Sequence, residues 1–281
     1  MISRFDFVLQ SKHGRDFSGD VRFVEDGKLK SVILFVHGFK GFKDALHFNA
    51  LADRFAENGF VMAKMNMSHN GTDPDHPMEF VDLEAFSNNN FTIELDDIDV
   101  VLDYIESEKF PIKAEEIDKS EIYLMGHSRG GGICILKACE DSRIKKLVTW
   151  AAVTDIEKLW GKDVLEEWKK LKTYYISNMR TGQQMPLNYQ IIEDFESSGD
   201  RFKIPKQVRK LKIPYLAIHG DADETVELDS LKVLTKANSK IKTHIIPNAT
   251  HTFGGKHPWE DEDLPLESEE LLNASVDFLK A

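Results

Sequence analysis

Hydrophobic and polar residues alternate with a period of two near the start of the chain, in residues 2–9 and 17–24. A turn-like segment with a glycine, residues 12–15, separates the two runs. Because successive side chains of a strand point to opposite faces of a sheet, such alternation is typical of strands with one exposed face. The pattern therefore predicts an antiparallel hairpin within the first 25 residues.

Beyond residue 30 the pattern changes to short apolar runs that alternate with segments of helical spacing. A continuous apolar run is typical of a strand that is buried on both faces of a parallel sheet. Apolar residues three and four positions apart indicate a helix with one buried face. The expected strands are 31–36, 61–65, 121–125, 146–150, 214–219 and 242–246, and the expected helices are 43–57, 91–109 with Thr92 as its cap, one ending near 140, 227–236 and 266–280.

Strands and helices that alternate over this length predict an α/β fold with a mostly parallel, doubly wound sheet. The alternation is interrupted over about residues 153–207, which are rich in charged and aromatic side chains. We interpret 153–207 as a cap inserted above the sheet and residues 1–281 as a single domain. The aromatic residues of the cap either line a pocket or form a small core of the cap itself.

Composition narrows the function classes. The chain has 281 residues, of which 41% are hydrophobic and 30% charged, with a formal net charge of −12. No apolar stretch reaches the roughly 18 residues of a spanning helix, and the first residues lack the pattern of a secretory signal. The negative charge disfavours binding to nucleic acid, which requires a basic surface. Cys134 and Cys139 are too few for a disulfide framework. We therefore expect a cytoplasmic protein with no nucleic-acid or membrane partner.

The strongest chemical signal is the segment Gly126-His127-Ser128-Arg129-Gly130, which follows an apolar strand and opens a helix rich in small residues. Gly-x-Ser-x-Gly alone arises often by chance, but between a strand and a helix it is typical of a nucleophile elbow. The glycines allow a tight turn that exposes the serine, and the helix N-terminus favours a developing anion. The alternative is a glycine-rich turn in which the serine only caps the helix.

A serine hydroxyl is a useful nucleophile only when a base takes its proton and a third group orients that base. The chain order expected for such an elbow is serine, acid, histidine. Asp223, just past the strand that follows the cap, is preferred as the acid to Asp221, which lies in the tighter part of the turn. His251, after the last strand, is preferred as the base. His244 lies inside that strand, and His257 lies in an acidic segment.

An oxyanion hole requires two backbone N–H donors that are aimed at one point. Arg129, directly after the serine, is expected to supply one donor. Phe39 is expected to supply the other, because it lies in the loop that follows strand 31–36. The alternative for this loop, which begins His37-Gly38, is a plain turn between strand and helix.

Together these segments resemble the α/β-hydrolase superfamily, through His-Gly-Phe at 37–39, Gly-His-Ser-x-Gly-Gly at 126–131, His-Gly-x-x-Asp-x-x-Val at 219–226 and a late histidine before Thr-Phe at 251–253. Within it the chain is similar to the dienelactone-hydrolase-like and cinnamoyl (feruloyl) esterase group, over about residues 31–255. The resemblance implies an α/β-hydrolase fold with a cap that shapes the acyl pocket. It also implies triad roles for Ser128, Asp223 and His251, and oxyanion roles for Phe39 and Arg129.

Two features do not follow from the resemblance. Arg129 stands where the cinnamoyl esterases usually have an uncharged polar residue, and a charged side chain there is able to alter substrate preference. A polar loop gathers four residues of metal-ligand type, His69, Asp73, Asp75 and His76. The same loop sequence is ordinary turn chemistry, and the expected mechanism requires no metal.

The function expected from the sequence is that of a serine hydrolase that cleaves carboxylic esters, cinnamoyl or other small acyl esters among them, through an acyl-enzyme. It needs no cofactor, and its partner is a small-molecule ester. A serine peptidase or acyl-aminoacyl hydrolase is the alternative among enzymes, because the same residues serve amides. A non-catalytic binding protein that retains the fold is the alternative outside enzymes. The substrate and the oligomeric state do not follow from the sequence.

Overall fold

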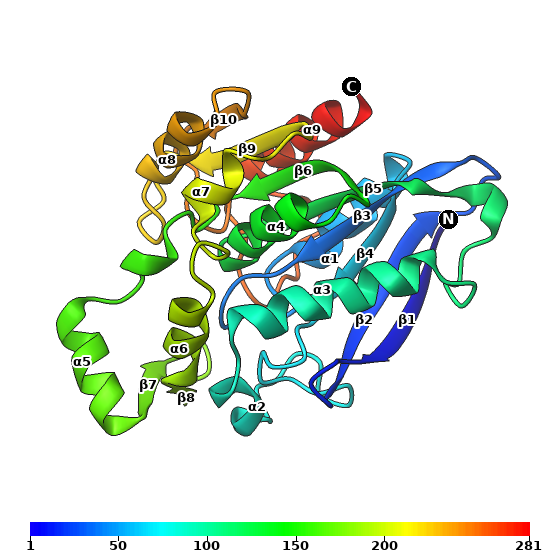
Figure 1. Ribbon diagram of the computed structural model, residues 1–281. Coiled ribbons are helices and arrows are strands. Elements are labelled where there is room, and N and C mark those ends of the chain that lie inside the picture. Colours follow the sequence, from blue (N-terminus) through cyan, green and yellow to red (C-terminus); the bar gives the residue numbers. More distant parts are fainter.

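Eight strands form one sheet in a computed structural model of the protein, which describes residues 1–281 (Figure 1). β1 and β2 run antiparallel to their neighbours, and the other six strands are mutually parallel. This arrangement confirms the predicted hairpin and the mostly parallel, doubly wound sheet. In spatial order the strands are β1 (Ile2–Gln10), β2 (Asp16–Val24), β4 (Val61–Met65), β3 (Lys30–Val36), β5 (Ile117–His127), β6 (Ile144–Trp150), β9 (Tyr215–Gly220) and β10 (Lys242–Ile246).

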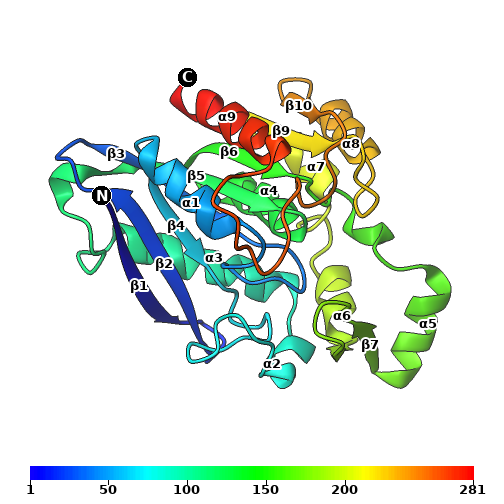
Figure 2. The same cartoon turned by 180° about the vertical axis from the view of Figure 1, so that it is seen from behind.

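Helices cover both faces of the sheet (Figures 1 and 2). On one face α1 (Phe48–Glu57) packs against α9 (Leu266–Lys280). On the other face the helices contact one another in sequence order, and they are α3 (Phe91–Glu106), α4 (Arg129–Glu140), α7 (Ile204–Val208) and α8 (Asp229–Ala237). None of the helices combines the length and the apolar character that crossing a membrane requires.

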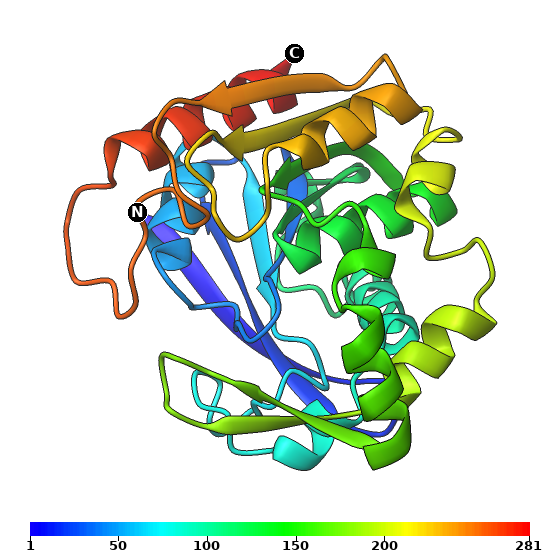
Figure 3. The same ribbon diagram turned by 90° about the vertical axis from the view of Figure 1, so that its left-hand side faces the viewer.

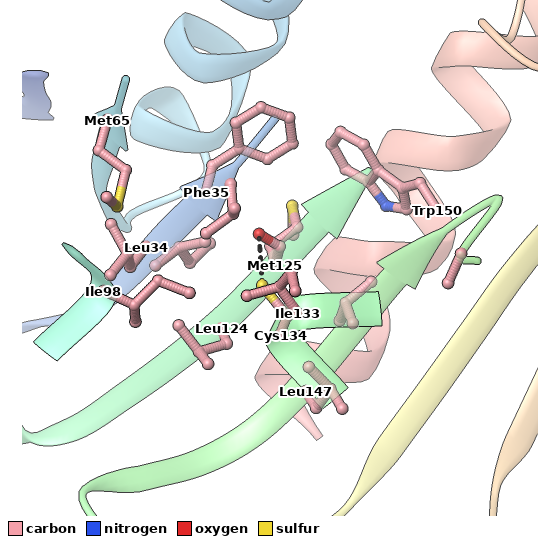
Figure 4. Packing of buried hydrophobic residues seen from close by; sticks show 14 of the residues in the cluster. Leu34, Phe35, Met65, Ile98, Leu124, Met125, Ile133, Cys134, Leu147 and Trp150 are labelled. Carbon is pink, nitrogen blue, oxygen red and sulfur yellow. Dashed lines mark hydrogen bonds between the residues drawn. The ribbon is translucent and has the colours of Figure 1, made fainter. Parts of the chain in front are cut away.

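The central strands are buried on both faces, which explains why their sequences are continuous apolar runs. Figure 4 shows side chains of β3, β5 and α4 packed into one cluster around the sheet. In it the ring of Phe35 lies 5.4 Å from that of Trp150. Cys134 of α4 is fully buried, and its thiol contacts the carbonyl oxygen of Met125 at 3.6 Å. Burial raises the pKa of that thiol, so the cysteine is a packing residue.

Two local predictions differ from the structure. α1 begins five residues later than expected, because residues 43–47 form turns and the side chains of Lys43 and Asp44 enter a buried ion cluster. Thr92 does not cap α3. The cap is Asn90, whose side-chain oxygen accepts the N–H of Ile93 at 2.9 Å. The Thr92 hydroxyl instead donates to a carboxylate of the inserted segment, that of Asp194, at 2.6 Å.

Two further elements were not predicted. A short helix, α2 (Leu83–Ser87), follows the polar loop, and the segment between β6 and β9 contains an antiparallel hairpin of β7 (Thr173–Ser177) and β8 (Gln184–Asn188). β8 lies beside α2 (Figure 3). The two strands have only five residues each, and a proline interrupts β8, so they lack the continuous apolar run of a central strand. The remaining elements are α5 (Lys162–Leu171), α6 (Gln190–Ser197) and 3-10 helices at Ala114–Glu116 and Ile156–Lys158.

The aromatic residues of the inserted segment form a small core of their own. Trp168 is fully buried, and its indole N–H donates to the carbonyl of Leu187 at 2.8 Å. Its ring packs against those of Trp160, Tyr174 and Tyr189 at centroid distances of 5.3, 5.7 and 6.0 Å. The sequence left open whether these aromatic side chains line a pocket or form a small core of the segment. The structure shows that they pack against one another within the segment.

A cluster of charged side chains is buried between β2, β4 and the start of α1. The ammonium of Lys64, which is fully buried, lies 2.6 Å from Asp44 Oδ1 and 3.3 Å from Asp20 Oδ1. Lys43 is 2.7 Å from the same oxygen of Asp20, and Arg22 donates to the other at 2.9 Å. Burial by itself raises the pKa of Asp20, but the surrounding cations hold that pKa well below its usual value. The cluster is therefore charged and internally compensated.

Replacing Lys64 by Met is expected to lower the free energy of unfolding by about 3–5 kcal/mol, because it leaves Asp20 and Asp44 with an uncompensated buried charge. Urea denaturation measures the change. The matched control is Lys232→Met, which removes an exposed lysine paired with Asp229 and is expected to cost no more than about 1 kcal/mol. Equal effects of the two substitutions would contradict the structural role of the cluster.

Candidate active site

The loops that carry the predicted site residues leave the sheet at one edge, because they follow the carboxyl ends of the parallel strands β3, β5, β9 and β10. β3 has β4 on one side and β5 on the other, so the chain changes its direction of progress across the sheet at this point. A crevice forms at such a switch point. Ser128, directly after β5, lies at this crevice.

Ser128 forms a tight turn between β5 and α4 with φ 57° and ψ −122°. Its N–H donates to the carbonyl of Trp150 at 2.9 Å, and its carbonyl accepts the N–H groups of Gly132 and Val153 at 3.2 and 3.0 Å. A backbone of this kind costs a non-glycine residue on the order of 1–3 kcal/mol and persists only when its surroundings fix it. The side chain of Ser128 makes no capping bond to α4, unlike a capping serine.

Two of the glycines around Ser128 are required by close backbone contacts. A Cβ atom on Gly130 would lie 2.3 Å from the carbonyl oxygen of His37 and 2.4 Å from that of Val36. A Cβ atom on Gly126 would lie 2.6 Å from the carbonyl oxygen of Gly130. Real Cβ atoms do not approach backbone oxygens so closely, so these positions let α4 begin directly against the end of β3.

The structure brings three predicted residues from separate loops into one hydrogen-bonded chain. The Oγ atom of Ser128 lies 3.0 Å from Nε2 of His251, and Nδ1 of His251 lies 2.8 Å from Oδ2 of Asp223. A carboxylate only accepts hydrogen bonds, so Nδ1 carries the proton of the neutral imidazole and Nε2 is free to accept from the serine hydroxyl. This is the geometry in which a histidine is able to deprotonate a serine.

The side chain of Asp223 is fully buried and fixed by several donors. Its Oδ1 accepts the N–H groups of Thr225 and Val226 at 2.8 and 2.9 Å. Its Oδ2 also lies 3.3 Å from Nε2 of His219, which donates to the carbonyl of Val226 at 2.7 Å. Burial by itself raises the pKa of Asp223, but the hydrogen bonds from His219 and His251 bring that pKa well below its usual value. The carboxyl group therefore stays ionised at neutral pH.

The three less preferred candidates for the acid and the base lie elsewhere. Asp221 accepts the N–H of Asn248 at 2.6 Å and so ties two loops together. His244 lies in β10, where its Nε2 is 2.8 Å from a carboxylate oxygen of Glu270. The ring of His257 packs edge-on against Phe42 at 5.1 Å. None of the three contacts Ser128.

The expected oxyanion donors flank Ser128. The backbone N–H groups of Phe39 and Arg129 make no hydrogen bond within the chain. Gly38 lies against the serine, because a Cβ atom placed on it would be 3.0 Å from Cβ of Ser128. His37 fixes this loop, since its Nδ1 lies 2.8 Å from the carbonyl oxygen of Gly38. The loop after β3 is thus held beside the serine with a free amide.

The charged side chain of Arg129 is buried behind that loop. Its guanidinium lies 2.9 Å from a carboxylate oxygen of Glu94, and its Nε donates to the other oxygen at 3.1 Å. The guanidinium carbon lies 5.0 Å from the ring centre of Phe39 and 4.6 Å from that of Phe91. The sequence led us to expect that this charge affects substrate preference. In the structure it is paired with Glu94, and Arg129 does not line the pocket around Ser128.

A pocket with about 530 Å³ of space, open to solvent, surrounds Ser128 and His251. Its walls come from the loop after β3, the start of α1, the loop after β10 and the β7–β8 turn. The inserted segment contributes one residue, Arg180, to which the sequence analysis gave no role. The lining residues are Gly38, Phe39, Gly41, Ala45, Leu46, Phe48, His127, Ser128, Arg180, His251 and Thr252.

The polar loop residues that were weighed as metal ligands do not converge on one point. His69 is buried, and its Nδ1 lies 2.7 Å from the hydroxyl of Ser68. His76 is exposed, and its Nδ1 lies 3.0 Å from a carboxylate oxygen of Asp73. Asp73 also accepts the backbone N–H of residue 76 at 2.6 Å, as in an ordinary turn.

The site contains a second histidine, His127, for which the sequence predicted no role. It is buried directly behind His251, with ring centres 4.7 Å apart, and its Nε2 lies 2.8 Å from the carbonyl oxygen of residue 251. Burial, together with the neighbouring His251, lowers its pKa to about 3. Its position next to the serine is the only sequence signal that indicated it.

A family model described as serine aminopeptidase (S33) matches residues 27–197, more than half of the chain. The protein belongs to this family of α/β hydrolases. The match includes Phe39 and Ser128 and ends before Asp223 and His251. No curated protein is similar to the chain in sequence.

Several solved structures share the fold at low sequence identity. Est1E from Butyrivibrio proteoclasticus superimposes with a TM-score of 0.68 at 19% identity, over 98% of this chain and 97% of that one, and another structure of Est1E holds ferulic acid. A putative dienelactone hydrolase from Klebsiella pneumoniae gives 0.64 at 15%, over 100% and 99%. A putative dipeptidyl aminopeptidase IV from Bacteroides ovatus gives 0.67 at 15%, over 100% of this chain but 36% of that one. The α/β-hydrolase fold is therefore confirmed.

The buried His127 is expected to make the fold less stable as the pH falls. Its pKa of about 3 in the native state lies below the value of about 6.5 of an unfolded chain, so below pH 6.5 the unfolded state binds a proton that the native state does not. The resulting loss is about 1.4 kcal/mol per pH unit, or about 2 kcal/mol at pH 5.

Urea denaturation of the wild type and of His127→Gln measures this contribution, since the glutamine amide is able to donate to the same carbonyl. The difference in unfolding free energy between the two proteins is expected to fall by about 2 kcal/mol between pH 7.5 and 5. The exposed control Lys232→Gln should keep a constant difference from the wild type. A pH-independent difference for His127→Gln would refute the prediction.

Proposed function

We propose that the protein is a serine hydrolase that cleaves carboxylic esters of small acids through an acyl-enzyme, with Ser128 as nucleophile, His251 as base and Asp223 as the orienting acid. The observation that carries the proposal is the hydrogen-bonded chain from Ser128 Oγ through His251 to Asp223, at 3.0 and 2.8 Å, which opens onto a solvent-accessible pocket. The strained backbone of Ser128 supports it, because strain of this kind gathers at active sites.

Acylation begins when the Ser128 hydroxyl attacks the ester carbonyl carbon while its proton moves to Nε2 of His251. The carbonyl oxygen takes up negative charge and accepts hydrogen bonds that the free N–H groups of Phe39 and Arg129 donate. The ionised Asp223 stabilises the imidazolium that has formed. The imidazolium then gives its proton to the departing alcohol as the carbon–oxygen bond to that alcohol breaks.

Deacylation repeats these steps with water in place of the serine. His251 accepts a proton from a water molecule that attacks the acyl carbon, and the oxyanion again forms in the same hole. When the bond to Oγ breaks, the imidazolium returns its proton to Ser128 and the carboxylic acid leaves. The balance requires one water molecule for each ester and no cofactor.

A peptidase or acyl-aminoacyl hydrolase is the second candidate, and the description of the matching family favours it. The chain covers 36% of the putative dipeptidyl aminopeptidase IV that shares its fold. Hydrolysis of a matched pair, the aryl acetate and the acetanilide of one aryl group, distinguishes the two reactions. A higher kcat/KM on the anilide would replace the ester proposal.

We further propose that residues 153–207 act as a cap of the single domain 1–281. Lys40 donates to the carbonyl of Ser177 at 3.0 Å, and Gln183 donates to the carbonyl of Phe80 at 3.0 Å. These contacts tie the β7–β8 hairpin to the loop after β3 and to the loop before α2. The hairpin thereby forms one wall of the pocket with Arg180.

Replacing Ser128 by Ala is expected to lower kcat on a short aryl acetate by a factor on the order of 10⁶, because the nucleophile is lost. A fluorophosphonate probe should label the wild type and leave the variant unlabelled. Hydrolysis of a hydroxycinnamate methyl ester beside the acetate tests the acyl preference. Substantial activity in the variant would show that another residue is the nucleophile.

Asp223→Asn is expected to lower kcat by a factor of about 10⁴, because an amide no longer fixes the proton of His251 on Nδ1. The matched control is Asp221→Asn, two residues away in the same loop, which contacts the backbone of Asn248 and not the histidine. Its kcat should remain within about tenfold of the wild type. Steady-state kinetics of both variants measures the contrast, and a larger loss in Asp221→Asn would reverse the assignment of the acid.

A further inference from the structure

The pocket around Ser128 differs in charge from the rest of the protein. The chain carries a formal net charge of −12, yet none of the residues that line the pocket is an aspartate or glutamate. The one lining residue with a permanent charge is Arg180, in the β7–β8 turn. A protein of this net charge repels anions on average, so a cation in the pocket is a local feature.

Arg180 has no acidic partner. Seven of the nine arginines form an ion pair with a carboxylate within 4.0 Å, and only Arg180 and Arg209 do not. The guanidinium of Arg180 donates to the carbonyl of Lys40 and lies 6.0 Å from the ring centre of Phe42. The residue is exposed to solvent, but partial desolvation lowers the pKa of Arg180 and no neighbouring carboxylate offsets this effect. Its charge is held in place by contacts that do not neutralise it.

A second cation stands beside it. The ammonium of Lys40 donates to the carbonyl of Ser177 and has no carboxylate within 4.0 Å. Burial and the nearby Arg180 both lower the pKa of Lys40. The same guanidinium contributes to lowering the pKa of His37, which burial brings to about 4, and of His257. Two like charges are thus fixed close together without a counter-ion, an arrangement that an anion entering the pocket would stabilise.

We propose that Arg180 selects ester substrates that carry a carboxylate, in the acid or in the alcohol part, and binds that carboxylate while Ser128 attacks the ester. The planar guanidinium has several N–H donors and is suited to paired hydrogen bonds with a carboxylate. Lys40, whose carbonyl accepts a hydrogen bond from Arg180, adds a second positive charge beside that guanidinium without lining the pocket itself. This inference rests on the proposed ester hydrolysis and names its substrate class.

Two pairs of substrates test the proposal, each pair differing only in one negative charge. The first pair is 4-nitrophenyl hydrogen adipate and its methyl ester, with the charge in the acid part. The second is 3-carboxyphenyl butyrate and its methyl ester, with the charge in the alcohol part. The readout is the ratio of kcat/KM for the charged ester to that for the neutral ester, and this ratio is independent of the overall activity of each variant.

In the wild type the ratio is expected to exceed ten for at least one pair. In Arg180→Gln that ratio should fall by a factor of about 10 to 100, and Arg180→Lys should retain part of it. Added salt should lower the wild-type ratio, since the pocket is open to solvent. The control Lys170→Gln removes an equal charge from the exposed face of α5 and should keep the wild-type ratio.

A wild-type ratio below one in both pairs, or a ratio unchanged by Arg180→Gln, would overturn the proposal. If the wild type hydrolyses none of the four esters, the proposed ester hydrolysis fails. A binding measurement then tests the carboxylate site separately. Calorimetry with 3-carboxyphenyl butyrate compares Ser128→Ala with Ser128→Ala/Arg180→Gln. Tenfold or more weaker binding in the double variant supports the carboxylate site without any turnover, and equal binding refutes it.

Discussion

The contact between Gly130 and the end of β3 determines where the other parts of the site lie. Because residue 130 has no Cβ atom, α4 begins directly against the carbonyl groups of Val36 and His37. This contact brings the loop after β3, with the free N–H group of Phe39, beside the first turn of α4, which has the positive end of the helix dipole and the free N–H group of Arg129. Ser128, between β5 and α4, has a positive φ of 57°, and its Oγ atom lies 3.0 Å from Nε2 of His251 in the loop after β10.

Buried charges in this protein are compensated by groups of the chain itself, whereas Arg180 is an exposed residue of the pocket and has no acidic partner. Lys64 is surrounded by carboxylates, and Asp223 has backbone amides and two histidines around it. Such groups remain charged because their partners replace the lost hydration. The guanidinium of Arg180 is supported by a carbonyl oxygen and an aromatic ring instead, which orient it but carry no opposite charge. In the proposed function, the carboxylate of a substrate supplies the opposite charge.

Much of the fold was predictable because the signals are local. Continuous apolar runs marked the parallel strands, and two of them, 61–65 and 242–246, match the observed bounds. The chain order of serine, acid and histidine indicated Ser128, Asp223 and His251, which the structure brings into one hydrogen-bonded chain. The β7–β8 hairpin was missed because its strands are only five residues long and their contacts with distant loops leave no signal in the local sequence.

Side-chain directions were harder to predict than positions, as the two arginines of the site illustrate. Arg129 follows the proposed nucleophile directly, so the sequence drew attention to its charge, but the helix turns the side chain away from the pocket into an ion pair with Glu94. There it packs against Phe39 and supports the loop that bears the second proposed oxyanion donor. Arg180 is 52 residues from Ser128 in sequence, in a segment without a recognisable motif, yet it lines the same pocket. Arg180 and Ser128 line one pocket because of how the inserted segment folds, so the charge that we propose to bind a substrate comes from this segment and not from the turn at Ser128.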